Sequence, residues 1–131
     1  MSTGSAKETR VLIVEDNFVV ADALRFLVES YGGFVSTIVP TLERAFAAFA
    51  ADPIDVAVLD VNLNGTSVVP FAERLHAEGV PFVFLTGYGD EELLPEHLRD
   101  YPRLGKPAES ERLILTLQEL ALRRGSDPGC S

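Results

Sequence analysis

The chain has 131 residues, of which 47% are hydrophobic and 24% charged, with a net charge of −9 and an isoelectric point near 4.6. This composition suits one globular domain, and the negative charge argues against direct binding to nucleic acid or to an anionic membrane. One cysteine cannot form an internal disulfide, and neither a signal peptide nor an apolar run of about 20 residues is present, so we expect a cytoplasmic protein.

The chain alternates between short apolar runs and longer helical patterns. Residues 1–9 are small and polar and predict a flexible N-terminus, and the turn-rich residues 125–131 predict a flexible tail. The runs that predict strands cover residues 11–14, 34–39, 56–59, 82–85 and, most weakly, 101–104. The first, third and fourth runs are apolar without alternation, which is typical of strands buried on both faces of a parallel sheet.

Helical spacing of apolar residues fills the intervals between these strands. It predicts a first helix with a buried stripe formed by Val20, Leu24, Leu27 and Tyr31. It also predicts a last helix that begins at Ser110, with a buried stripe formed by Leu113, Leu117 and Leu120. Thr41 is the expected N-cap of a second helix, and residues 68–77 form a third. Residues 87–100 are the poorest helix, because Pro95 cannot donate a helical hydrogen bond, so we expect a short, interrupted or mobile helix there.

Five β–α units in succession predict an α/β fold with a parallel sheet and helices on both of its faces. In such sheets functional sites form at the carboxyl ends of the strands. Polar side chains gather at those ends: the chain places there Glu15, Asp16, Asp60, Thr86 and Lys106.

This set of side chains suits phosphoryl chemistry. If the first and third strands are neighbours, about 4.8 Å apart, three carboxylates cannot all stay ionised without a counter-charge, and Mg²⁺ would supply one. A carboxylate beside such a metal is a usable nucleophile toward phosphorus. Lys106 and the Thr86 hydroxyl would then hold two phosphoryl oxygens.

Four motifs, in order and spacing, resemble the receiver domain of two-component response regulators: VLIVEDN, VLDVNLNG, FLTG and GKP. The resemblance covers residues 10–124 and implies a flavodoxin-like (βα)5 fold with strand order 2-1-3-4-5. It also implies site roles: Asp60 as phosphoacceptor, Glu15 and Asp16 as acidic metal ligands, the Asn62 backbone carbonyl as a further Mg²⁺ ligand, Thr86 as switch hydroxyl and Lys106 as the family's lysine. The Lys106–Pro107 peptide bond is cis in such domains and is expected to be cis here.

One position departs from the family pattern. Arg103 stands three residues before the lysine, where typical receivers carry Tyr or Phe, and is therefore a switch candidate. The structural alternative is a solvated charge at the end of the strand. The segment PFVFLTGYG resembles the PFxFATGY signature of the receiver subgroup nicknamed FAT GUY, with Leu85 in place of Ala. That subgroup lacks the strand-five aromatic, is mostly stand-alone and tends to work with histidine kinases of the HWE type. Tyr88 is then a candidate for the mobile aromatic.

The resemblance implies a phosphoacceptor domain and not an enzyme for outside substrates. A histidine kinase or a phosphotransfer protein would phosphorylate Asp60, and the domain would assist its own phosphotransfer and dephosphorylation. Because no output domain follows residue 124, we expect either a signal passed by protein contact at the face of the fourth and fifth helices or a phosphate sink.

Other readings remain open. Arg103 keeps a phosphorylation-independent adaptor possible. A flavodoxin-like cofactor binder would need a phosphate-binding loop where this chain has the acidic EDNF, and an aspartate-dependent phosphatase would need a general acid where Asn62 stands. The individual residues also have structural readings: Asp60 could cap a helix, Asp16 or Asn17 could be an N-cap, and Thr86 is a favoured strand residue in any sheet.

Overall fold

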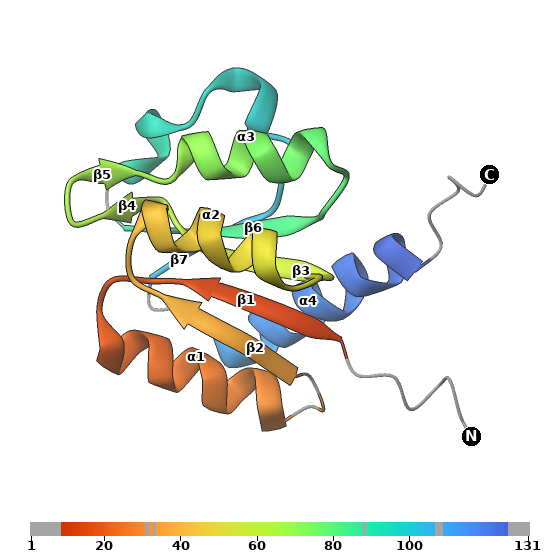
Figure 1. The fold of residues 1–131 in the computed structure, drawn as a ribbon. Helices are drawn as coiled ribbons and strands as arrows, with labels where there is room; N and C mark the ends of the chain where they lie inside the picture. Colours follow the sequence, from red (N-terminus) through yellow and green to blue (C-terminus); the bar gives the residue numbers. More distant parts are fainter. Residues whose placement is uncertain (1–8, 31, 33, 88, 107–108, 126–131) are drawn as a thin grey trace.

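The computed structural model describes residues 9–30, 32, 34–87, 89–106 and 109–125, and its centre is a parallel five-stranded sheet (Figure 1). The strand order is β2-β1-β3-β6-β7. These strands are β1 (Arg10–Val14), β2 (Phe34–Val39), β3 (Val56–Asp60), β6 (Phe82–Thr86) and β7 (Arg103–Gly105). The predicted flavodoxin-like α/β fold with order 2-1-3-4-5 is confirmed.

Helices cover both faces of the sheet (Figure 1). On one face, α2 (Leu42–Ala51), α3 (Val69–Ala77) and the 3₁₀ turn η2 (Glu96–Leu98) pack on one buried cluster, which Leu94 also joins just after the 3₁₀ turn η1 (Asp90–Leu93). On the other face, α1 (Phe18–Ser30) and α4 (Ser110–Gly125) pack on a second cluster. Among the described residues, no helix has both the length and the hydrophobicity to traverse a bilayer.

The central strands divide their side chains between these two clusters. In β1, Leu12 and Val14 face α2 and α3, whereas Val11 and Ile13 face α1 and α4. Strand β3 and strand β6 alternate in the same way and are buried at every position. Because each face of the sheet meets a helical layer, the side chains on both faces of these strands must be apolar up to the polar residue at the strand end. This explains why the sequences of the strands are apolar without alternation.

The helix predictions were confirmed in part. Thr41 caps α2, since its Oγ1 accepts a hydrogen bond from Arg44 N at 3.2 Å, and the predicted leucines of α4 are buried. The stripe predicted for α1 was confirmed in part: Leu24 is buried, and Val20 and Leu27 are partly buried against the second cluster, but Ala21 and Val28, which were not predicted, are also buried there. Tyr31 lies outside the described residues.

Three local features differ from, or sharpen, the expectations. The poor helix over residues 87–100 consists of η1 and η2, interrupted at Pro95 as expected. Strand β7 begins two residues later than predicted. A hairpin of β4 (Asn62–Leu63) and β5 (Thr66–Ser67) was not predicted, although Asn64 and Gly65 are the residues that such a turn favours, with φ of 53° and 92°.

Candidate functional site

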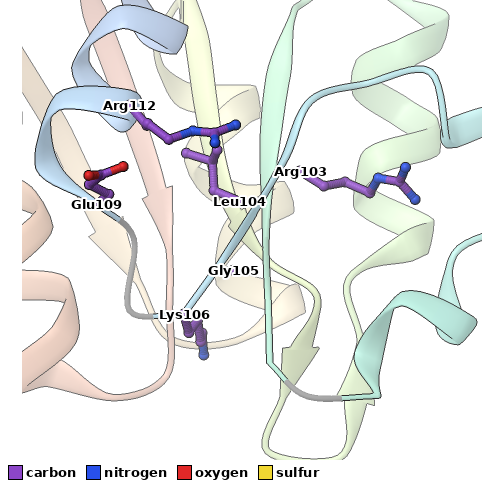
Figure 2. Close-up of a pocket in the computed structure, with 6 residues that line it drawn as sticks. All are labelled: Arg103, Leu104, Gly105, Lys106, Glu109 and Arg112. Carbon is purple, nitrogen blue, oxygen red and sulfur yellow. The ribbon is translucent and has the colours of Figure 1, made fainter.

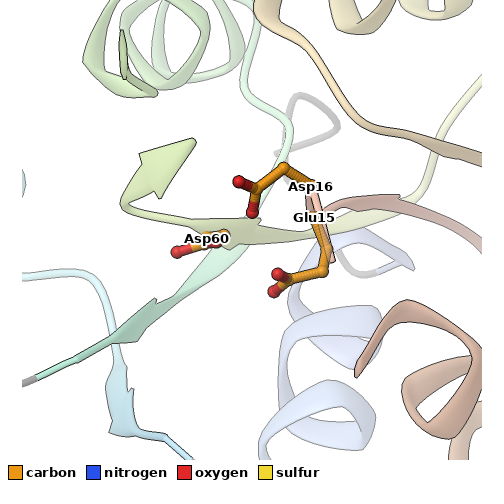
Figure 3. A group of neighbouring side chains, drawn as sticks. All are labelled: Glu15, Asp16 and Asp60. Atoms are coloured by element: carbon orange, nitrogen blue, oxygen red, sulfur yellow. The ribbon is translucent and has the colours of Figure 1, made fainter. Parts of the chain in front are cut away.

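Three carboxylates meet at the carboxyl end of the sheet (Figure 3). Val14 of β1 lies opposite Leu59 of β3, so Glu15 and Asp60 follow neighbouring strand positions. One carboxylate oxygen from each of Glu15, Asp16 and Asp60 lies within 4.8 Å of the others. Glu15 is 2% exposed and Asp60 is 0% exposed, whereas Asp16 is exposed. Two buried acids therefore stand behind one solvent-facing acid.

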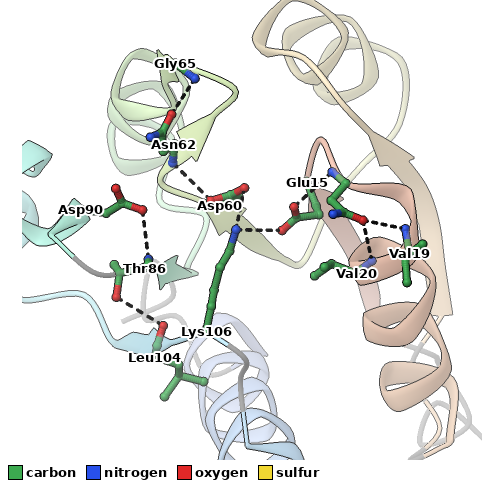
Figure 4. A network of polar contacts seen from close by, with 12 residues as sticks. Glu15, Val19, Val20, Asp60, Asn62, Gly65, Thr86, Asp90, Leu104 and Lys106 are labelled. Carbon is green, nitrogen blue, oxygen red and sulfur yellow. Dashed lines mark hydrogen bonds and ion pairs between the residues drawn. The ribbon is translucent and has the colours of Figure 1, made fainter.

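Lys106 supplies the positive charge next to this cluster (Figure 4). Its Nζ lies 3.0 Å from Asp60 Oδ2 and 3.7 Å from Glu15 Oε1. The backbone holds the lysine in place, because Lys106 N donates to the Thr86 carbonyl at 2.9 Å. The strand order places the lysine here, because β7 pairs with β6 and Lys106 follows directly after β7.

The buried carboxylates have too few hydrogen-bond partners in the described part of the chain. Asp60 Oδ1 accepts from Asn62 N and Glu15 Oε2 accepts from Asn17 N, both at 3.2 Å. The remaining oxygens, Asp60 Oδ2 and Glu15 Oε1, are buried and accept no hydrogen bond of good angular geometry, although the Lys106 ammonium is close to both. Buried polar atoms in this state favour the binding of a further cation.

The pKa values show the same shortage of positive charge. Burial, and secondarily the Asp60 carboxylate, raises the pKa of Glu15 from 4.5 to about 7. Burial also raises the pKa of Asp60, with Lys106 opposing this shift. Burial alone would lower the pKa of Lys106, but Asp60, Glu15 and Asp16 outweigh it, and the pKa rises. One ammonium thus serves two buried acids.

Asn17 is the N-cap of α1. Its Oδ1 accepts from Val19 N at 2.9 Å and from Val20 N at 3.2 Å. The choice between Asp16 and Asn17 as the cap is therefore settled, and the Asp16 carboxylate stays at the exposed side of the cluster.

Asn62 lies beside Asp60 at the start of the β4–β5 hairpin. Its backbone N–H bonds Asp60, and its side-chain Oδ1 accepts from Gly65 N at 2.7 Å. The side chain is thus engaged in the turn, so a metal contact from this residue would have to come from its main chain, as predicted.

The last residue of β6, Thr86, and the residue after it, Gly87, form hydrogen bonds outside the carboxylate cluster. Thr86 is 4% exposed, and its Oγ1 points at the Leu104 carbonyl 3.5 Å away, on the side of β7 (Figure 4). Gly87 N donates to Asp90 Oδ2 at 2.9 Å. From the sequence, Asp90 is expected only as part of an acidic run that forms a solvated helix start or a surface that repels or selects a partner. Its bond to Gly87 was not predicted, although an aspartate three residues after a glycine can close a loop through its side chain.

Arg103 does not join the carboxylates. It is exposed and lines a pocket of about 410 Å³ together with Leu104, Gly105, Lys106, Glu109 and Arg112. Figure 2 shows its side chain directed away from that of Lys106. The other switch candidate, Tyr88, and the peptide bond to Pro107 lie outside the described residues.

Residues 11–118 match the family model of the response regulator receiver domain. The chain belongs to this family. It is similar to the sensory transduction protein RegX3 of Mycolicibacterium smegmatis, with 34% identity over 91% of this chain and 53% of that protein, so it spans about half the length of such relatives. Receiver domains are phosphoacceptor modules of two-component signalling, partnered by histidine kinases, and not enzymes in the usual sense.

Solved structures agree with this membership. SdrG from Sphingomonas melonis superposes with a TM-score of 0.76 at 37% identity, covering 86% of this chain and 96% of SdrG. The receiver domain of PhyR from Erythrobacter litoralis gives a TM-score of 0.80 at 25% identity, covering 91% of this chain and 94% of that chain.

Proposed function

We propose that this receiver takes a phosphoryl group on Asp60 from a histidine kinase or a phosphotransfer protein. The observation that carries the proposal is the buried Asp60 carboxylate, with Lys106 Nζ 3.0 Å away and two further carboxylates within 4.8 Å. Carboxylates in such surroundings are suited to nucleophilic attack when a cation screens the incoming phosphoryl charge.

The donor set fits Mg²⁺. It consists of oxygen ligands only, and two buried carboxylate oxygens lack hydrogen bonds of good geometry in the described chain. Glu15, Asp16, Asp60 and the Asn62 carbonyl would hold the ion. When bound, Mg²⁺ would neutralise charge on the phosphoryl oxygens.

The transfer itself requires little beyond positioning. An Asp60 oxygen attacks phosphorus, the new O–P bond forms, and the bond between phosphorus and the donor imidazole nitrogen breaks with its electron pair left on the imidazole. Lys106 orients the Asp60 carboxylate beforehand and binds a phosphoryl oxygen afterwards. Thr86 would rotate away from the Leu104 carbonyl to bind another oxygen. Water attack on phosphorus later releases inorganic phosphate and restores the carboxylate.

We further propose membership of the FAT GUY subgroup and a histidine kinase of the HWE type as donor. The support is the segment PFVFLTGYG together with Arg103 at the position of the usual aromatic. Output by protein contact would use the surface that η1, η2, β7 and α4 form, where the Arg103 pocket lies. A phosphate sink would need the same site chemistry without a partner at that surface.

The test is a titration with beryllofluoride and Mg²⁺, followed by amide chemical shifts, together with phosphorylation by a phosphoramidate and intact-protein mass spectrometry. The wild-type protein should gain one phosphoryl group and show shifts around Asp60, Thr86 and residues 87–100. Asp60→Asn should abolish both responses because the amide is not a nucleophile. Asp52→Asn is the matched control, since Asp52 is an exposed aspartate at the opposite end of the sheet.

An unchanged spectrum in the wild-type protein at saturating Mg²⁺ and beryllofluoride would contradict the proposal and favour the phosphorylation-independent adaptor. Phosphorylation that survives Asp60→Asn would assign the acceptor to another residue.

A further inference from the structure

The loop after β6 is closed by two hydrogen bonds between Gly87 and Asp90. Gly87 N donates to Asp90 Oδ2 at 2.9 Å, and Asp90 N donates back to the Gly87 carbonyl at 3.1 Å. Asp90 is also the first residue of η1, so this pair sets where the 3₁₀ turn begins. A carboxylate thus binds a backbone N–H immediately after Thr86, at the carboxyl end of the sheet.

The hydrogen-bond ladder shows which way that N–H faces. In the ladder between β3 and β6, Ala57 N donates to the Pro81 carbonyl and Val61 N to the Leu85 carbonyl, so alternate residues of β6 face β3. The Thr86 carbonyl, one residue on, faces β7 and accepts from Lys106 N. The next backbone N–H to face β3 belongs to Gly87, beside the end of the strand that carries Asp60.

The ladder does not continue there. The partner that the pattern would give to Gly87 N, the Val61 carbonyl, instead accepts from Val68 N at 3.1 Å. The Asp90 carboxylate takes the place of that carbonyl. A Cβ at position 87 would lie 3.0 Å from Asp90 Oδ2 and would crowd this contact, and glycine avoids that crowding.

We infer that Asp90 is an internal competitor of the phosphoryl group: its carboxylate occupies the Gly87 N–H in the unmodified protein and leaves when Asp60 is phosphorylated. This inference rests on the proposed function. A phosphoryl group on Asp60 would bring negative charge and strong acceptor oxygens to the same side of β6. Its charge repels the Asp90 carboxylate, and its oxygens are alternative acceptors for the Gly87 N–H.

Release of Asp90 has a structural consequence. Departure of the carboxylate breaks one of the two hydrogen bonds that fix the start of η1 and leaves only the backbone bond from Asp90 N to the Gly87 carbonyl, so the start of η1 is loosened. Leu94, which is 1% exposed, follows this turn into the core under α3. Asp90 is therefore a positioning residue that links charge at Asp60 to the conformation of residues 90–94 and does not itself touch phosphorus.

The test compares beryllofluoride titrations of three variants in the full chain with Mg²⁺ present. Asp90→Ala removes the competitor and should tighten binding on the order of tenfold. Asp90→Asn keeps a neutral acceptor and should fall between Asp90→Ala and wild type. Glu92→Gln removes the same charge from an exposed residue of the same turn and should stay within about twofold of wild type.

A second readout follows the hydrogen bond itself. In the wild-type protein, saturation with beryllofluoride should shift the Gly87 amide resonance and speed hydrogen exchange in η1, whereas in Asp90→Ala η1 should exchange quickly from the start. Binding that weakens in Asp90→Ala, or that changes no more than in Glu92→Gln, would overturn the inference while leaving Asp60 phosphorylation intact. Absence of binding in every variant would overturn the proposed function instead.

Discussion

Acidic side chains lie at both ends of the sheet, but their surroundings differ. At the amino end, Asp55 Oδ2 accepts from Arg10 N at 2.9 Å, and Glu78 pairs with Arg74 at 2.5 Å with side chains that are 45% and 50% exposed. At the carboxyl end, Glu15 and Asp60 are almost fully buried and share one lysine. The comparison shows that burial with too few hydrogen-bond partners, and not the residue type, distinguishes the carboxylates for which we propose metal binding and phosphorylation.

The two ends of the sheet should differ most in the free energy of unfolding when the basic side chain that pairs with the acids is removed from each end. Lys106→Met leaves two buried carboxylates without a counter-charge and should cost about 2 kcal/mol of unfolding free energy at pH 8. Arg74→Met breaks an exposed pair and should cost less than about 1 kcal/mol. Urea unfolding of both variants measures this, and equal losses would contradict the comparison.

The pH dependence of stability should come from the carboxyl end. The raised pKa of Glu15, from 4.5 to about 7, contributes stability that is complete below pH 4.5 and is lost as the pH rises through about 7. Without Mg²⁺ the wild-type protein should therefore lose on the order of 2 kcal/mol between pH 5 and 8.

Glu15→Gln should flatten that profile, because the amide does not ionise. Added Mg²⁺ should restore wild-type stability at pH 8 by binding the folded state alone. The measurement is urea unfolding across the pH range, and a wild-type profile that rises from pH 5 to 8 would contradict the assignment.

The smallest effect on the pH profile and on beryllofluoride binding is expected from a residue near the site that is not one of its acids. Thr41 lines a pocket with Asp16, but it caps α2 and touches no carboxylate of the cluster. Thr41→Ala should cost about 1 kcal/mol and leave the pH profile and the beryllofluoride midpoint unchanged. A changed beryllofluoride midpoint in Thr41→Ala would contradict this, because it would show that residues outside the acidic cluster also control beryllofluoride binding.

Local signals predicted most of the elements. Pro95 predicted the interruption between η1 and η2, and Thr41 predicted the cap of α2. Two features were predicted only in part or not at all. The stripe of α1 contains apolar residues over more than one face, so the contacts with β1, β2 and α4 decide that Ala21 and Val28 are buried as well as Leu24. The hairpin turn at Asn64 and Gly65 was not predicted, although both residues favour the positive φ that it requires.

The structure brings some of the predicted site residues together and directs others toward different partners. Glu15, Asp16, Asp60 and Lys106 meet, as their positions after the strands predicted. Thr86 belongs to the same edge, but its hydroxyl points toward Leu104. No local pattern could reveal that orientation, since it depends on where β7 lies beside β6.

The sequence by itself determined the element types, the α/β class and the identity of the chemical groups at the strand ends, because these follow from hydrophobic periodicity, caps and turn residues within a few positions of one another. The tertiary structure decided how those groups act. Burial from two helical layers raises the pKa values of Glu15 and Asp60, and the pairing of β7 with β6 brings in Lys106. The ladder between β3 and β6 ends at Val61, whose carbonyl accepts from Val68 N, and the Gly87 N–H therefore binds Asp90 instead. This choice of partner depends on long-range contacts, which no local pattern in the sequence shows.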